Sequence, residues 1–168
     1  LVTRYEDLRE AVVHYVSRAG EKLRKEGLAA QSLTVFAHTN PFREQDTPYS
    51  ASRVVPLVMP TQDTRKLIAA ALAGLKDLYI PDINYKKAGV MLTDLVNQDV
   101  QQEDLFDVTD SDASKRLMQT IDAINHRQGR GTVYLSAEGG NHRSWRMQSK
   151  MRSPAYMSSW ADIRTART

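Results

Sequence analysis

The side chains best suited to chemistry are polar and basic residues on three stretches that alternate like β-strands. Together they form one candidate site: Thr34, His38, Arg53, Lys86, Lys87 and Gly89. Hydroxyl, imidazole, guanidinium and ammonium groups on an exposed sheet face can bind the phosphates of a nucleic-acid backbone without reading its sequence. A glycine lets such a backbone approach closely. The alternative is a solvated sheet face that binds no ligand.

No catalytic or metal-binding pattern accompanies these residues. The four histidines lack metal-ligand spacing, the serines lack a visible base, and no phosphate-binding glycine loop leads into a helix. The chain has no cysteine, which excludes disulfides, thiol nucleophiles and cysteine-bound zinc. We therefore expect no catalytic residue, no metal site and no cofactor in this chain.

A second candidate site is a short peptide in an acidic stretch, Gln102-Glu103-Asp104-Leu105-Phe106. A glutamine, an acid and an adjacent Leu-Phe pair resemble the pentapeptide with which bacterial proteins dock on the sliding clamp. Leu105 and Phe106 can fill an apolar pocket, and Gln102 can anchor the peptide by hydrogen bonding. The predicted clamp-binding residues are Gln102, Asp104, Leu105 and Phe106. In the alternative interpretation, the Leu-Phe pair packs against its own domain.

Hydrophobic periodicity predicts the elements that position the first site. In chain order, they are a helix ending near Gly27, strands at residues 31–39 and 52–59, a helix with Thr61 as its N-cap, and a strand at residues 85–95. Pro56 argues for an edge position or a bulge in the second strand. This order predicts an α+β fold, a split βαβ (ferredoxin-like) antiparallel sheet whose opening strand is missing. Two helices would cover one sheet face and leave the other free for a ligand.

Net charge divides the 168 residues into three parts. It is +1 over residues 1–100, −5 over residues 101–113 and +7 over residues 114–168, within a total of +3. Such an asymmetry suggests separate functions for the parts. The basic C-terminal part either attracts nucleic acid or only keeps the surface soluble.

We therefore expect a domain at residues 1–95, an acidic linker with the clamp-binding peptide at 96–113, and a C-terminal extension at 114–168. The extension is predicted to contain a short helix at residues 114–125 and a strand at Thr132–Leu135.

The chain has no apolar run near the ~20 residues that a membrane span needs, and no basic-then-apolar leader. We therefore expect no membrane association and a cytoplasmic location. The first residue is Leu1 rather than methionine, which predicts a piece of a longer protein.

Eight stretches carry a resemblance to a known family. They are AGEKLR (19–24), TNPF (39–42), PTQDTR (60–65), YKKAGVML (85–92), LFD (105–107), GRGTVY (129–134), WRM (145–147) and SPAY (153–156). Together they resemble the C-terminal half of UmuC-type proteins (the ImpB/MucB/SamB family), the catalytic subunits of DNA polymerase V and its plasmid relatives. These belong to the Y family of translesion polymerases.

The resemblance implies that residues 1–95 are a little finger domain, which in this family grips the primer–template DNA with its open sheet face. It also implies that residues 102–106 dock on the sliding clamp, and it allows contacts of the extension with a UmuD-type subunit and RecA. The family's magnesium-binding carboxylates lie in a palm domain that is absent here. We therefore expect no polymerase activity from this chain, although its parent would be an error-prone polymerase of the SOS response to DNA damage.

The family begins its little finger with a strand upstream of the first helix, so we expect the sheet to be one strand short. A partner molecule fills the gap, or the 132–135 strand does, or nothing does. A second functional hypothesis is a protein-interaction module that binds RecA or a UmuD-type subunit with little DNA affinity. A third, an independent ferredoxin-like enzyme, is disfavoured because no acid–base or metal cluster is visible.

Overall fold

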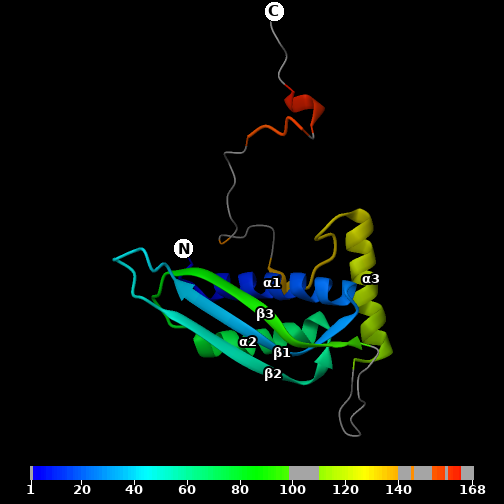
Figure 1. The fold of residues 1–168 in the computed structure, drawn as a ribbon, viewed down its shortest axis with the longest axis horizontal. Coiled ribbons are helices and arrows are strands. Elements are labelled where there is room, and N and C mark those ends of the chain that lie inside the picture. Colours follow the sequence, from blue (N-terminus) through cyan, green and yellow to red (C-terminus); the bar gives the residue numbers. More distant parts are fainter. Residues whose placement is uncertain (1, 99–109, 140–144, 146–152, 158, 164–168) are drawn as a thin grey trace, which may run out of the picture.

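The computed structural model describes residues 2–98, 110–139, 145, 153–157 and 159–163 (Figure 1). Its elements are α1 (Tyr5–Lys25), β1 (Leu28–Thr39), β2 (Ser50–Thr61), α2 (Thr64–Leu78), β3 (Tyr85–Asn97), α3 (Asp112–Gln128) and two 3-10 turns at Ser136–Glu138 and Trp160–Asp162. The predicted order of helices and strands in the first domain is confirmed. The helix of the extension is longer than the predicted 114–125.

The three strands form one antiparallel sheet in the order β2-β1-β3, so β1 is the central strand. Leu33 of β1 lies opposite Val55 of β2 and Leu92 of β3. Pro56 lies on the edge strand β2, next to a register shift, as the sequence predicts. Proline has no amide hydrogen to donate to a neighbouring strand. On an edge strand the proline can face solvent, so no hydrogen bond between strands is lost.

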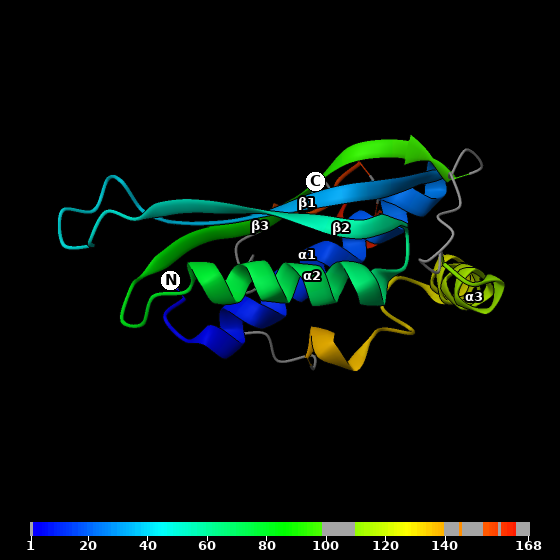
Figure 2. The same ribbon diagram turned by 90° about the horizontal axis from the view of Figure 1, so that it is seen from below.

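The core lies between the sheet and the two long helices, which both pack on the same sheet face (Figure 2). Its fully buried members include Leu8, Val12 and Val16 of α1, Leu33, Val35 and Ala37 of β1, and Leu67, Ala71 and Leu75 of α2. Burying each leucine contributes about 1.5–3 kcal/mol. Because side chains alternate across a strand, this core leaves the opposite face of the sheet free of helices. The predicted α+β architecture is therefore confirmed.

Residues 132–135 form no strand and add none to the sheet, so the predicted strand at Thr132–Leu135 is wrong. Gly129 and Gly131 have positive φ angles of 106° and 82°, which turn the chain back toward α3. There the Val133 amide donates to Asn125 Oδ1 at 2.9 Å, and Asn125 Nδ2 donates to the Val133 carbonyl at 2.8 Å. These backbone groups are therefore satisfied by a helix side chain and not by a neighbouring strand. On the edge of β3 that does not pair with β1, Val2 forms an isolated antiparallel bridge with Tyr85.

Helix α2 is capped by Asp63, because the Asp63 carboxylate accepts from the Arg65 amide at 2.8 Å. The prediction of Thr61 as N-cap is wrong by two residues. The Thr61 hydroxyl instead accepts from the Asp63 amide and donates to Asp110 at 2.7 Å. The sequence offers two good capping residues in succession, and contacts from a distant segment decide between them.

Two buried carboxylates join this helix start to α3, and we call the contact the Asp63–Asp110 junction. Asp63 accepts from the Ser114 hydroxyl at 2.5 Å and pairs with Arg65 at 2.6 Å. Asp110 accepts from the Gln62 amide at 3.0 Å. Asp110 falls in the predicted linker, yet only 4% of it is exposed. The start of α3 is therefore held against the first domain.

Among the described residues, no helix is both long enough and apolar enough to cross a membrane.

Candidate nucleic-acid interface

The sheet face that turns away from the helices is the candidate interface, and we call it the open face. Residues opposite one another on antiparallel strands share a face, so the register defines its members. They are Ser32, Thr34, Phe36 and His38 of β1, Ser50, Ser52, Val54 and Pro56 of β2, and Lys87, Gly89, Met91 and Thr93 of β3. Five of these twelve residues carry hydroxyl groups. The hydroxyls of Ser32 and Thr93 are hydrogen-bonded to each other, and Ser32 also donates to Asp94. The other three, on Thr34, Ser50 and Ser52, can donate hydrogen bonds to phosphate oxygens.

Four of the six residues predicted to bind nucleic acid lie on the open face. Thr34 lies near the middle of β1, opposite Val54 and Met91. His38 lies nearer the end of β1, where Lys87 is its partner on β3. Gly89 lies on β3 between these two rows. The sequence pattern therefore brings a hydroxyl, an imidazole and an ammonium group together on one exposed surface.

Lys86 and Lys87 place two cations at one end of the sheet. The register between β1 and β3 shifts at this point, with His38 opposite Lys87 and Thr39 opposite Tyr85. Lys86 is thus the extra residue of a β-bulge, a feature that strengthens the local twist and redirects side chains. Both lysines are exposed, and neither makes an ion pair with any residue that the structure describes.

Arg53 lies on the other face of the sheet, so its predicted place on the open face is wrong. It is opposite Val35, whose side chain belongs to the core beneath the helices. Its guanidinium reaches past the sheet edge and pairs with Asp77 of α2 at 3.3 Å. Strand side chains alternate, so a shift of one position along β2 moves a residue to the opposite face.

Because Gly89 has no side chain, it leaves space for the Phe36 ring of the neighbouring strand. The sequence had suggested instead that this space admits the backbone of a ligand. A Cβ atom at Gly89 would stand 2.5 Å from Cζ of Phe36. The Phe36 ring also lies nearly parallel to the His38 ring, with centroids 6.5 Å apart and an interplanar angle of 19°. Phe36 is therefore a member of the site that sequence reasoning missed. Its signal was an aromatic residue that interrupts the polar side of β1.

We expect Gly89→Ala to lower the free energy of unfolding by about 1 kcal/mol, because the new methyl group must push the Phe36 ring aside. In a Phe36→Ala background, the same substitution should be neutral or slightly stabilising, since alanine suits a strand better than glycine. Urea denaturation of the four proteins in this double-mutant cycle measures the coupling. An equal cost of Gly89→Ala in both backgrounds would contradict the packing role.

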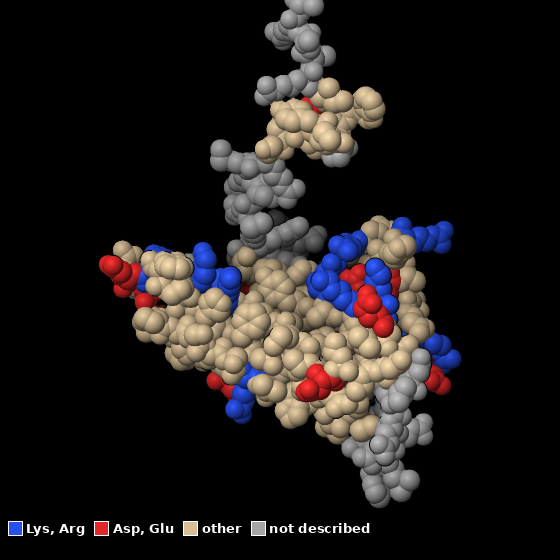
Figure 3. All heavy atoms as spheres, in the orientation of Figure 1, with Lys and Arg blue, Asp and Glu red and all other residues tan. Residues whose placement is uncertain are grey.

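Charged side chains lie mainly around the margins of the view in Figure 3, and few lie across its middle. Of the twelve open-face residues, only Lys87 carries a full charge. Val54 and Met91 are exposed by 60% and 54%, so apolar surface lies beside the hydroxyls. Such a surface can contact sugars and phosphates at many points, while the cations at its end supply the electrostatic attraction.

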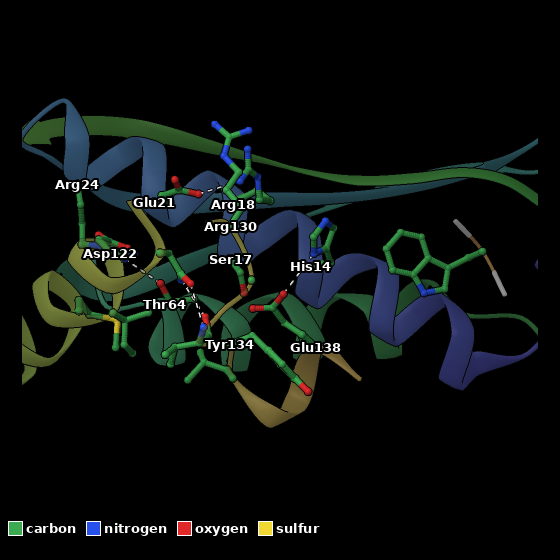
Figure 4. Close-up of a pocket in the computed structure, with 17 residues that line it drawn as sticks. His14, Ser17, Arg18, Glu21, Arg24, Thr64, Asp122, Arg130, Tyr134 and Glu138 are labelled. Atoms are coloured by element: carbon green, nitrogen blue, oxygen red, sulfur yellow. Dashed lines mark hydrogen bonds and ion pairs between the residues drawn. The ribbon is translucent and has the colours of Figure 1, made fainter. Parts of the chain in front are cut away.

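A cavity of about 410 Å³ lies away from this face, between α1, α3 and the segment that follows α3 (Figure 4). None of the six predicted nucleic-acid residues lines it. Two arginines of its lining pair with acids, Arg24 with Asp122 at 2.6 Å and Arg18 with Glu21 at 3.0 Å. The His14 ring lies within hydrogen-bond distance of Glu138, at 3.2 Å. The Arg24–Asp122 and His14–Glu138 contacts therefore hold the extension against α1. Within the described ranges, no group of three or more histidine or acidic side chains is arranged to hold a metal ion.

The four predicted clamp-binding residues, Gln102, Asp104, Leu105 and Phe106, lie outside the described residues. Their role stays a prediction.

Comparison with known proteins gives two family matches and several similar proteins. Residues 1–105 match the impB/mucB/samB family C-terminal domain, and residues 115–166 match a domain of unknown function (DUF4113). Protein SamB of Salmonella typhimurium is 40% identical over 167 residues, 99% of this chain and 39% of that protein. Protein UmuC of Salmonella typhimurium is 39% identical over 96% of this chain, and Protein MucB of Escherichia coli is 39% identical over 94%. The chain thus spans less than two fifths of the length of these relatives.

Proposed function

This chain belongs to the impB/mucB/samB family, and from that premise we propose that it is the DNA-gripping and clamp-tethering part of an error-prone translesion DNA polymerase of the SOS response. The observation that carries the proposal is the open face, with its hydroxyls and two exposed lysines at one end. Its fold is consistent with the little finger domain that the sequence resemblance implies. The polymerase would act in the cytoplasm and bind primer–template DNA.

The dimensions of the open face suit a DNA duplex. Strand β1 has 12 residues, which corresponds to a length of about 40 Å. One turn of B-form DNA is about 34 Å long. A strand of this length can therefore span about one helical turn along the axis of the duplex. The hydroxyls of Thr34 on β1 and of Ser50 and Ser52 on β2 would contact the backbone at several points.

The chemistry of the open face favours binding without sequence preference. Arginine, asparagine and glutamine are the side chains that most often read base edges, and none is among its twelve members. A polymerase that copies damaged DNA must hold any sequence, so a face built from hydroxyls, apolar groups and lysine meets that need. The catalytic carboxylates and their magnesium ions would lie in a palm domain of the parent protein, and this chain alone would have no polymerase activity.

The clamp-binding peptide would supply the second part of the function. Leu105 and Phe106 would fill an apolar pocket of the sliding clamp and hold the polymerase near the primer terminus. Such a tether raises the effective concentration of the grip on DNA without any new contact to DNA.

A second candidate function is a protein-interaction module that binds a UmuD-type subunit or RecA. It is favoured by exposed apolar side chains in the extension: Tyr156, Met157, Trp160 and Ile163 are exposed by 42%, 99%, 92% and 48%. Exposed aromatic residues in clusters are typical of protein-binding surfaces.

Binding of a labelled duplex at a series of salt concentrations tests the DNA-gripping function. We expect affinity to fall steeply with salt, because bound lysines release counterions from the phosphates. The double variant Lys86→Ala/Lys87→Ala should bind about tenfold more weakly and lower the salt slope by about 2. Fluorescence anisotropy measures both quantities.

Arg53→Ala is the matched control, since it removes a cation from the other face of the sheet and should leave duplex binding nearly unchanged. If the unaltered chain binds a UmuD-type subunit or RecA but shows no salt-dependent DNA affinity, the second candidate function is correct and the first is not.

A further inference from the structure

The loop between β1 and β2 presents an aromatic side chain to solvent. It extends beyond the helices at one end of the sheet (Figure 2). At its start, Phe42 is exposed by 92%. A large aromatic residue gains nothing from such a position in the folded chain alone, because its ring stays hydrated.

Hydrogen bonds preorganise the backbone around Phe42. The Arg43 amide donates to the Asn40 carbonyl at 3.3 Å, which closes a turn with Pro41 and Phe42 at its centre. The side chain of Asn40 accepts from the Phe42 amide at 3.3 Å. Proline fixes one backbone angle of this turn, and the asparagine side chain stabilises it. Phe42 therefore needs little ordering before it can bind a partner.

A buried carboxylate attaches the turn to the start of β3. Asp46 is exposed by only 6%, and it accepts from Asn84 Nδ2 at 2.9 Å. The Asp46 amide also donates to the Arg43 carbonyl at 3.1 Å, so a second turn follows the first. Asn84 precedes Lys86 by two residues. The exposed ring and the two exposed lysines are thus held at the same end of the sheet.

We propose that Phe42 stacks on an unpaired nucleobase of DNA bound at this end of the open face, an inference that rests on the proposed DNA-gripping function. Every base has an apolar face on which an aromatic ring can stack, whatever the sequence. In a duplex those faces are covered by neighbouring pairs, and separating them costs a few kcal/mol. An unpaired base avoids this cost. Lys86 and Lys87 would bind the phosphates beside it.

Two DNA molecules test the proposal: a blunt duplex, and the same duplex with a short single-stranded extension that contains 2-aminopurine. The chain should bind the extended DNA more tightly and change the 2-aminopurine fluorescence. Phe42→Ala should lose about tenfold in affinity for the extended DNA, equivalent to about 1.4 kcal/mol. It should bind the blunt duplex as before.

Phe42→Trp should retain both the affinity and the fluorescence change, since indole stacks at least as well. Leu117→Ala is the matched control, because Leu117 is an exposed apolar side chain on α3, outside the sheet. It should behave like the unaltered chain.

The outcomes separate this proposal from the function on which it rests. If the unaltered chain binds neither DNA, the proposed function fails. If it binds both, and Phe42→Ala binds both equally well with the same fluorescence change, stacking by Phe42 is overturned while DNA gripping stands. Normal DNA binding by Phe42→Ala with a selective loss of sliding-clamp binding would also overturn the proposal, because it would assign the ring to a protein pocket.

Discussion

Replacing Asp63 by alanine is expected to lower the free energy of unfolding by about 2–3 kcal/mol at neutral pH. The substitution removes the N-cap of α2 and leaves the Arg65 guanidinium and the Ser114 hydroxyl without their shared acceptor. Because Ser114 lies in the first turn of α3, the contact between α3 and the first domain should weaken as well. Urea denaturation followed by circular dichroism measures the loss.

Asp77→Ala is a suitable control, since Asp77 is also an acid paired with an arginine but lies at the surface with 56% of its side chain exposed. An exposed ion pair of this kind contributes at most about 1 kcal/mol. Equal losses for the two variants would contradict a special role of the Asp63–Asp110 junction.

The same carboxylate makes stability depend on pH. Burial by itself would raise the pKa of Asp63, but hydrogen bonds from Arg65 and Ser114 and the charge of Arg65 outweigh burial and lower the pKa below its ordinary value. The unfolded chain, with an aspartate pKa of about 3.9, therefore binds a proton more readily than the folded chain. The stabilisation by Asp63 is present above this pH and is lost as pH falls through the folded-state pKa. The stability difference between the unaltered chain and Asp63→Asn should shrink below about pH 4.

The largest functional effect is expected from Leu105→Ala/Phe106→Ala, which should reduce sliding-clamp binding by at least about 100-fold. Two adjacent apolar anchors of a docking peptide each contribute about 2 kcal/mol or more when they fill a pocket. Duplex DNA binding should stay nearly unchanged, because the open face does not include these residues. Surface plasmon resonance on an immobilised clamp and anisotropy with duplex DNA measure the two affinities.

Val100→Ala provides the matched control, since it truncates an apolar residue of the same acidic stretch outside the pentapeptide. It should bind the clamp normally. Equal loss of clamp and DNA binding in the double variant would contradict the division into a grip and a tether.

Local pattern was enough to predict most of the first domain. Helical spacing of apolar residues and strand alternation depend on neighbours within a few positions, and these periods are intrinsic to the backbone geometry. The strand at residues 132–135 failed because its side chains alternate, but its backbone pairs with Asn125. This contact depends on where the fold places Asn125, so the pattern of residues 132–135 alone could not predict it.

The candidate site was likewise predicted only in part from the sequence. The alternation of β1 correctly grouped Thr34 and His38, because both lie on one strand with a known period. Arg53 could not be assigned without the register of β2 against β1, and the purpose of Gly89 could not be seen without Phe36 opposite it. Pairing between strands is set by turns, bulges and the shared core, which no single strand encodes.

The amino-acid sequence by itself determined the family resemblance, the order of helices and strands, the uneven charge and the existence of one sheet face free of helices. Only the tertiary structure decided which residues share that face, which arginines pair with acids and where the extension attaches. The reason is that periodicity is a property of adjacent residues. A face, an ion pair or the Asp63–Asp110 junction exists only when residues distant in sequence meet.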